Sequence, residues 1–147
     1  MQSLAHQPTF VTFAICSLLM SAQLIALWAY SGFVRTKTKK VVNAEDVRFS
    51  KTASVDPVDP PEVARVLRAH ANAMAVTVPF FMMGLLYALL EGPEGRAKVV
   101  FPVFVLARFA HAFFYLRGIQ PWRTITFATS ALMTGVLIIS NIILLAR

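Results

Sequence analysis

The fold is decided where a short basic segment runs into a long apolar one, in the stretch Arg65-Val66-Leu67-Arg68-Ala69-His70-Ala71-Asn72. In a helix Arg65, Arg68 and Asn72 recur at three- and four-residue spacing, so they share one face. The residues that follow are almost wholly apolar as far as Leu90. Charges at the mouth of a membrane helix are costly unless they have partners or water. This stretch therefore either anchors a helix at the membrane interface or builds a site for an anion.

The composition indicates an integral membrane protein. Of the 147 residues, 57% are hydrophobic and only 14% are charged, whereas a soluble domain is about half apolar and about a quarter charged. The net charge is +7, but no basic face with interleaved aromatic residues lies outside the apolar runs, so nucleic-acid binding is not expected. The lone cysteine, Cys16, lies within an apolar run. We interpret it as a packing residue, because apolar burial makes a thiol unreactive.

Four apolar runs are long enough to cross a bilayer, for which about 20 residues are needed. We expect helices over about 8–35, 62–90, 97–117 and 121–146, forming one all-α membrane domain over residues 1–147. The polar loop 36–61 joins the first two helices. Within it, Asn43 is expected to cap a short helix, and Asp59 is expected to be the N-cap of the second long helix, just before two prolines. The chain is thus predicted to be a four-helix, multi-pass membrane bundle.

Lysine and arginine are distributed unevenly around these runs. One side of the predicted membrane holds Arg35, Lys37, Lys39, Lys40, Arg48, Lys51, Arg65, Arg68, Arg117 and Arg123, and the other side holds Arg96, Lys98 and Arg147. Cytoplasmic loops carry the excess of positive charge. Both termini and the second loop are therefore predicted to lie on the non-cytoplasmic side. The membrane would be the inner membrane in a bacterium, and the endoplasmic reticulum or another intracellular membrane in a eukaryote.

Polar side chains also occur inside the predicted spans. Arg108, His111 and Tyr115 lie at i, i+3 and i+7 of the third helix and so line one face. An arginine near the bilayer centre costs about 3 kcal/mol or more, so it should face the bundle interior. Since the helices alternate in direction, several polar side chains should reach one level on the cytoplasmic side. They are Arg35, Arg65, Arg68, His70, Asn72, Arg108, His111, Tyr115, Arg123 and Thr124.

No acidic residue lies within the apolar runs to neutralise this cluster. The cluster therefore needs an anionic ligand, lipid headgroups or water. The alternative is that Arg35, Lys40, Arg65 and Arg117 are anchors whose side chains reach out to the lipid headgroups.

Several motifs, read in order, resemble the MAPEG family, membrane-associated proteins of eicosanoid and glutathione metabolism. The stretch from Arg65 to Asn72, followed by Pro79-Phe80, resembles the family's second-helix signature, and Arg108-Phe109-Ala110-His111 with Tyr115-Leu116 resembles its third-helix motif. The end of the first helix, its loop and the start of the fourth helix are also similar, through Phe33-Val34-Arg35, Val42-Asn43-Ala44-Glu45-Asp46 and Pro121-Trp122-Arg123-Thr124. The resemblance covers essentially the whole chain.

This resemblance implies a homotrimer that binds glutathione between neighbouring subunits. The expected glutathione-binding residues are Arg35, Arg68, His70, Asn72, Arg108, His111 and Tyr115, and the expected catalytic residues are Arg123 and Thr124. The positive end of the fourth helix, Arg123 and a hydroxyl would all favour the thiolate. The implied activities are conjugation of glutathione to lipophilic electrophiles, glutathione-dependent peroxidase action and isomerisation of lipid endoperoxides. The implied partners are a lipophilic substrate, membrane lipids and other copies of the chain, with no metal.

The chain departs from the prostaglandin synthase branch of the family at three positions. Ala71 stands where that branch has Arg, Ala75 where it has Glu, and Phe127 where it has Tyr. The missing Glu removes a partner for the free amine of glutathione, and the missing Arg removes a carboxylate contact. Prostaglandin synthesis as such is therefore not expected.

Three other functions remain compatible with four spans. The first is a non-catalytic member of the family that binds lipid or a partner protein. The second is a small transporter, which would be expected to use an intramembrane acid that the apolar runs lack. The third is a haem or quinone protein that uses His70 and His111. We expect the glutathione-dependent enzyme rather than any of these three alternatives.

Overall fold

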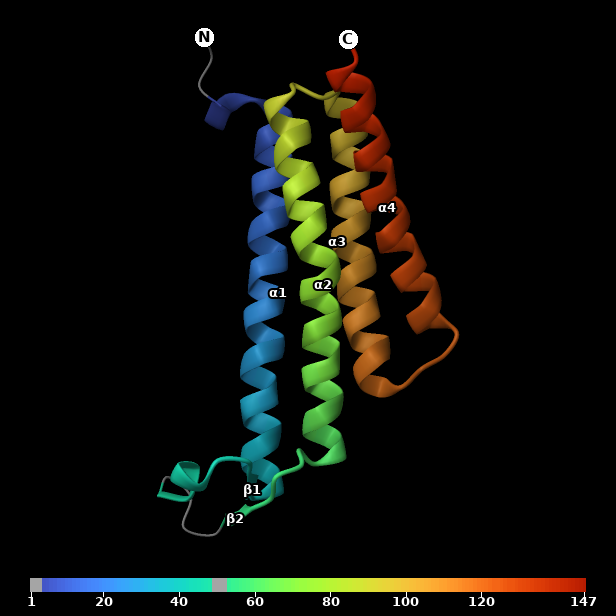
Figure 1. Cartoon of the computed structure of the whole chain (residues 1–147). Helices are drawn as coiled ribbons and strands as arrows, with labels where there is room; N and C mark the ends of the chain where they lie inside the picture. The colour runs from blue at the N-terminus through green and yellow to red at the C-terminus, as the bar shows by residue number, and fades with distance from the viewer. Residues whose placement is uncertain (1–3, 49–52) are drawn as a thin grey trace.

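Four long helices run alternately up and down in one bundle (Figure 1). The computed structural model describes residues 4–48 and 53–147. The helices are α1 (Pro8–Thr38), α2 (Pro61–Leu89), α3 (Glu94–Arg117) and α4 (Trp122–Leu145). Each is long and apolar enough to cross a membrane. The prediction of an all-α, multi-pass membrane bundle is therefore confirmed. The homotrimer and the side of the membrane that each end faces stay predictions.

The helix boundaries differ from the expected ones by a few residues. α1 continues past Arg35 to Thr38, and Lys39 ends it with a left-handed backbone at φ 52°. α3 begins at Glu94 and ends at Arg117. The φ of 70° at the following Gly118 lets the N–H groups of Gly118 and Ile119 turn back onto the carbonyls of Tyr115 and Phe114. Because α1 and α2 are longer than α3 and α4, they extend beyond the α3–α4 turn (Figure 1). We call this end of the molecule the loop end, and the opposite end the termini end.

The loop between α1 and α2 is held by a short sheet and two ion pairs. The strands β1 (Lys40–Val41) and β2 (Ser54–Val55) pair in parallel, and the 3-10 helix η2 (Ala44–Arg48) follows Asn43; another, η1 (Leu4–His6), precedes α1. Lys40 pairs with Asp56 at 2.7 Å. Lys51, which the sequence analysis places on the cytoplasmic side, lies outside the described residues.

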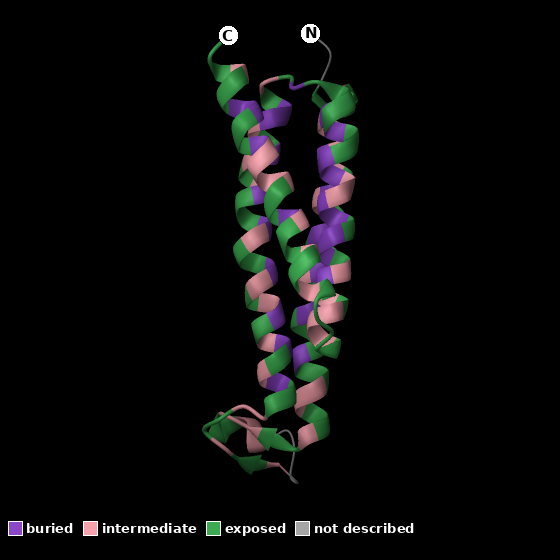
Figure 2. Cartoon of the chain, turned by 90° about the vertical axis from the view of Figure 1, so that its right-hand side faces the viewer, coloured by how far each residue is buried: buried purple, intermediate pink, exposed green. Residues whose placement is uncertain are grey.

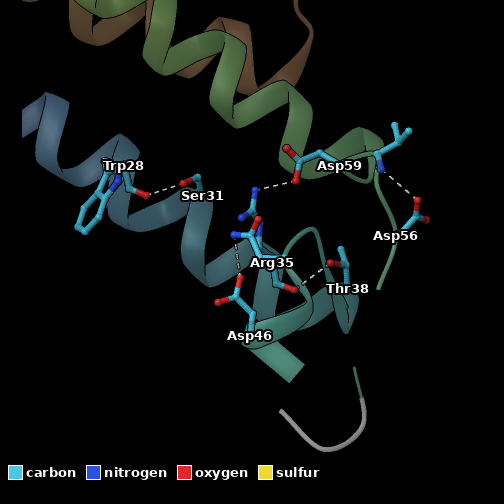
Figure 3. A network of polar contacts seen from close by, with 9 residues as sticks. Trp28, Ser31, Arg35, Thr38, Asp46, Asp56 and Asp59 are labelled. Atoms are coloured by element: carbon cyan, nitrogen blue, oxygen red, sulfur yellow. Dashed lines mark hydrogen bonds and ion pairs between the residues drawn. The ribbon is translucent and has the colours of Figure 1, made fainter. Parts of the chain in front are cut away.

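The expected N-cap at Asp59 is wrong. Pro60 takes the N-cap position of α2, and the Asp59 carboxylate instead accepts a hydrogen bond from Nη2 of Arg35 at 2.6 Å. Figure 3 shows Arg35 lying between Asp59 and Asp46, which point toward it from the two ends of the loop. A charged partner on α1 is a stronger attraction for the carboxylate than the backbone amides of its own helix.

Aromatic rings form the core toward the termini end. Phe80 and Phe104 stack with their centroids 3.5 Å apart, and Phe101 meets Phe13 and Tyr87 edge-on at 5.9 and 6.2 Å. We call these five residues the aromatic core. The ring of Phe13 packs directly on Gly84, where an added Cβ would lie 2.9 Å from it. α1 and α2 can therefore approach closely here.

The outer faces of the helices are exposed and apolar. Buried residues follow the inner faces of the helices (Figure 2), and large side chains such as Leu18, Trp28 and Leu106 are exposed on the outside. This arrangement places the apolar outer surface against lipid and leaves the interior for packing and for polar groups.

Candidate functional site

Arg108 is the most deeply buried charge of the described residues. It lies midway along α3 with 1% of its surface exposed, and its Nη2 donates a hydrogen bond to Oδ1 of Asn72 on α2 at 3.0 Å. Its Nε and Nη1 have no partner, and no carboxylate in residues 4–48 and 53–147 pairs with it. A buried charge without a counter-charge is costly. Arg108 therefore makes this level of the bundle attractive to an anion or to the polar groups of a ligand.

His111 lies one turn further toward the loop end and links α3 to α4. Its Nδ1 is 2.8 Å from the carbonyl oxygen of Arg123. A carbonyl only accepts, so Nδ1 carries the proton and donates, and Nε2 is the acceptor of the neutral ring. That Nε2 is buried and has no partner among the described residues. The imidazole ring lies between the rings of Tyr115 and Phe127, with centroid distances of 5.7 and 5.8 Å. The site therefore offers a fixed, unused hydrogen-bond acceptor.

A cavity of about 260 Å³ opens beside these side chains. Its walls are Asn72, His111, Tyr115, Arg123, Thr124 and Phe127. A second cavity of about 280 Å³ adjoins it through the shared walls Tyr115 and Arg123, and also contacts Arg65, Arg68 and Gly118. Together the two cavities fall within the range of roughly 300–1,000 Å³ that small-molecule sites occupy. We call them the inner cavity and the arginine cavity.

Gly118 shapes the arginine cavity. A Cβ at this position would lie 2.8 Å from Nη1 of Arg65, and the backbone φ of 70° favours glycine. The absence of a side chain lets the Arg65 guanidinium lie against the end of α3, where the helix carries partial negative charge. Arg65, predicted as an interfacial anchor or a member of the cluster, thus forms a wall of the arginine cavity.

The first turn of α4 supplies the remaining wall. The guanidinium carbon of Arg123 is 5.1 Å from the ring centroid of Tyr115. In the amide orientation that satisfies both of its neighbours, the side-chain oxygen of Gln120 accepts from Nε and Nη2 of Arg123 at 3.1 and 2.8 Å, and its nitrogen donates to Oγ1 of Thr124 at 3.0 Å. Sequence reasoning missed Gln120. The signal that could have found it is its spacing of three and four residues from Arg123 and Thr124.

The structure brings most of the predicted site residues together. Asn72, His111, Tyr115, Arg123 and Thr124 surround the inner cavity, Arg108 is bonded to Asn72, and Arg68 lines the arginine cavity. They come from α2, α3 and α4. Three consecutive helices thus contribute to one polar site at the loop end.

Two predicted site residues lie elsewhere in the protomer. Arg35 is paired with Asp59 and lines a separate hollow with Lys39, Lys40 and Asp46. His70 is half-buried on α2 and lines none of the cavities described above. It precedes Asn72 by two positions, which is about 200° around a helix. Within one protomer neither residue lines the inner cavity or the arginine cavity, and their roles in binding glutathione stay predictions.

The site is suited to an anionic ligand with further polar groups. The walls of both cavities contain arginines and no acid. Among residues 4–48 and 53–147, no group of three or more His, Cys, Asp or Glu side chains could hold a metal ion. The apolar Phe127 and the Tyr115 ring border the same space. Such an arrangement can hold carboxylates, stabilise an anionic nucleophile and admit an apolar reactant.

Comparison with known proteins gives consistent matches. The model of the MAPEG family matches residues 13–143. Human prostaglandin E synthase is 32% identical over 126 residues, which cover 85% of this chain and 82% of the relative. Human microsomal glutathione S-transferase 1 is 32% identical over 123 residues, which cover 80% of this chain and 79% of the relative. The matched region includes every wall residue of the two cavities.

Proposed function

The chain belongs to the MAPEG family, and we propose that it is a glutathione-dependent membrane enzyme that conjugates glutathione to lipophilic electrophiles or uses it to reduce lipid hydroperoxides. Its relatives prostaglandin E synthase and microsomal glutathione S-transferase 1 support a glutathione-dependent activity. The observation that carries the proposal is the acid-free inner cavity, with Arg123 and Thr124 on one wall and unpartnered His111 opposite.

Glutathione fits the polar groups that the site leaves unused. It carries two carboxylates, which arginines bind through charge-assisted hydrogen bonds. Arg68 and Arg65 in the arginine cavity are suited to one carboxylate. In the inner cavity, Nε2 of His111 can accept from an N–H of the peptide, and Asn72 is held in place by Arg108. We expect these residues to bind and orient the tripeptide.

Arg123 and Thr124 are the proposed catalytic residues. A thiolate is the reacting form of the sulfur, and it is favoured by a nearby cation and by a helix N-terminus. Arg123 supplies the cation at the start of α4, and the Thr124 hydroxyl can donate to the sulfur. In conjugation, the sulfur forms a bond to the electrophilic carbon, and the leaving group departs with the bonding electron pair.

Hydroperoxide reduction would use the same thiolate. The sulfur attacks the terminal peroxide oxygen, the O–O bond breaks, and the alkoxide takes up a proton to become an alcohol. The sulfenic acid left on the first glutathione reacts with a second glutathione to give the disulfide and water. Both reactions need one lipophilic reactant, which can reach the Phe127 side of the inner cavity from the bilayer.

The proposal includes the homotrimer and a cytoplasmic loop end. Arg35 is separated from the cavities within one protomer and is already paired with Asp59. An Arg35 that contacts glutathione would therefore have to come from a neighbouring subunit, as the resemblance implies. The excess of Lys and Arg at the loop end supports the cytoplasmic placement.

The test is glutathione binding to detergent-purified protein by calorimetry, followed by turnover of a chloronitrobenzene. We expect saturable binding, weakened about tenfold in Asn72→Ala, since a hydrogen bond to a charged or polar ligand is worth about 1.5 kcal/mol. Arg123→Ala should keep its thermal midpoint but lose turnover. Arg96→Ala, at the termini end, is the matched control. Absence of binding at millimolar glutathione, or full turnover of Arg123→Ala, would refute the proposal.

A second candidate is a family member that binds lipid or a partner without catalysis. It is favoured by Ala71 and Ala75, which are both exposed on α2 and stand where the prostaglandin synthase branch carries charges. This function predicts no glutathione binding in the same titration, together with stabilisation of the protein by lipid.

A further inference from the structure

Gln120 is an exposed residue just before α4. Its side-chain oxygen accepts from two nitrogens of Arg123, Nε at 3.1 Å and Nη2 at 2.8 Å, and its nitrogen donates to Oγ1 of Thr124 at 3.0 Å. The opposite orientation of the amide would set its N–H groups against the N–H groups of the guanidinium. Donors and acceptors therefore fix the orientation. One side chain contacts both residues that we propose to act on the sulfur.

The guanidinium of Arg123 is consequently held from two directions. Gln120 bonds one edge of it, and the Tyr115 ring lies under it with the guanidinium carbon 5.1 Å from the ring centroid. An arginine side chain otherwise has many rotamers and loses conformational entropy when it is fixed. Because Gln120 and Tyr115 fix it in advance, the N–H groups that Gln120 does not use are already placed for a ligand in the cavities.

The same contact sets the direction of the Thr124 proton. A hydroxyl has one proton to donate and lone pairs that accept. Since Oγ1 of Thr124 accepts from the Gln120 nitrogen, its own proton stays free to donate elsewhere. If residue 120 were only an acceptor, it would draw that proton to itself. The amide thus allows Thr124 to donate to an anion.

We propose that Gln120 is a positioning residue that directs the free donors of Arg123 and Thr124 onto the glutathione sulfur. This inference rests on the proposed function. The backbone of the turn does not depend on the Gln120 side chain, because the N–H groups of Arg123 and Thr124 donate to the carbonyls of Ile119 and Pro121 at 3.2 and 2.9 Å. Changing the side chain should therefore alter the chemistry and leave the helix intact.

The experiment uses two variants of nearly equal size. Gln120→Met removes all three hydrogen bonds of the amide, and Gln120→Glu keeps an acceptor for Arg123 but removes the donor to Thr124 and adds a negative charge. Bound thiolate is measured by its ultraviolet absorbance as a function of pH, and kcat and KM are measured with glutathione and a chloronitrobenzene. The control is Gln7→Met at the termini end, where the Gln7 amide donates a hydrogen bond to a carboxylate oxygen of Glu91 at 3.4 Å.

For Gln120→Met we expect kcat to fall about tenfold with less than a threefold change in the KM for glutathione, because the charge-assisted hydrogen bonds that orient Arg123 are lost. The pH at which half of the bound thiol is ionised should rise by about one pH unit. For Gln120→Glu we expect kcat to fall about a hundredfold. The pH of half-ionisation of the bound thiol should rise further than in Gln120→Met, since the carboxylate offsets the charge of Arg123. Gln7→Met should behave like the wild type.

The outcomes separate this inference from the proposed function. If Arg123→Ala loses the thiolate signal while both Gln120 variants keep wild-type kcat and pH profile, the role of Gln120 is wrong and the proposed function stands. If the wild type shows no thiolate and no glutathione binding, the proposed function fails and takes this inference with it. A fall in kcat with an unchanged pH profile would also overturn the positioning role, because it would show that the sulfur is not affected.

Discussion

The two halves of the bundle differ in which buried polar groups are left without partners. Toward the termini end, the Tyr87 hydroxyl donates to the Pro93 carbonyl at 3.0 Å, and Thr9 donates to the Gly92 carbonyl at the same distance. Toward the loop end, Arg108 and His111 are as deeply buried but keep nitrogens without partners. The unpartnered buried side-chain atoms outside the loop end belong to neutral groups, such as Oδ1 of Asn141 and Oγ1 of Thr77. The second half is left incomplete and borders two cavities.

This difference separates stability from ligand binding. The bilayer core offers no water, so a polar atom there is satisfied by protein or by something bound to it. The aromatic core fills its half with stacked and edge-on rings. Near the inner cavity the helices instead present charges and an unused imidazole nitrogen. We expect substitutions in the first half to unfold the protein, and substitutions in the second half to affect the ligand.

The largest effect is expected at the centre of the aromatic core. Phe101 is fully buried and contacts Phe13, Phe80 and Tyr87. Phe101→Ala should lower the free energy of unfolding by about 3 kcal/mol, because the cavity it leaves cannot be filled by neighbouring rings. Titration of the folded protein with a denaturing detergent measures this. The fraction that stays folded should bind glutathione normally; a specific loss of binding would show that the two halves are coupled.

Substitution of Arg108 is expected to affect stability less, and glutathione binding more, than substitution of Phe101. Arg108 is as deeply buried as Phe101: the exposed fractions of the two residues are 1% and 0%. Arg108→Met should change the free energy of unfolding by less than about 1 kcal/mol, since an apolar side chain of similar size replaces an uncompensated charge. Glutathione should bind about tenfold more weakly, because Asn72 loses its hydrogen-bond donor.

Arg108→Lys provides the control for charge alone. It should recover part of the affinity without restoring the geometry of the Asn72 contact, because lysine lacks the planar fork of donors. If Arg108→Met instead destabilised the bundle as strongly as Phe101→Ala, the buried guanidinium would be a structural group, and the distinction between the two halves would be wrong.

The smallest effect is expected outside the bundle, at the Lys40–Asp56 pair. A hydrogen bond from Lys40 holds the pKa of the Asp56 carboxyl below its ordinary value. Since the pKa is lowered in the folded state, the pair contributes at neutral pH, and its contribution is lost only as the pH falls through that lowered pKa. Asp56→Asn should leave the thermal midpoint at pH 7 unchanged within error, because the carboxylate is exposed. A clear drop would show that the loop sheet supports the bundle.

The fold could be predicted almost completely from the sequence. Apolar runs of sufficient length determine where helices cross a bilayer, because the backbone has no other way to satisfy its hydrogen bonds there. The four predicted helices are present, with ends displaced by a few residues. The periodicity of Arg108, His111 and Tyr115 correctly placed them on one face of α3. Two of these side chains meet a partner from another helix, Asn72 or Arg123.

The site could be predicted only in part, and the misses have physical reasons. Asp59 reads as an N-cap from its position before two prolines, but a cation on α1 lies within 2.6 Å of it. His70 lies at the depth of Asn72, as the sequence predicts, but on another face of α2, and its role in binding glutathione stays a prediction. Gln120 was missed because its function depends on which way an amide turns between two neighbours. These results depend on side-chain direction rather than on sequence spacing.

The sequence by itself determined that this chain is a four-span helical membrane protein with a cationic, acid-free level in its interior. Hydropathy and charge act locally, so they can be read from residues in order. Only the tertiary structure decided which of those cations face a common cavity, which are neutralised by the loop, and which nitrogens of Arg108 and His111 are left without partners. Hydrogen bonds need short distances and fixed directions, and those are set when the helices pack.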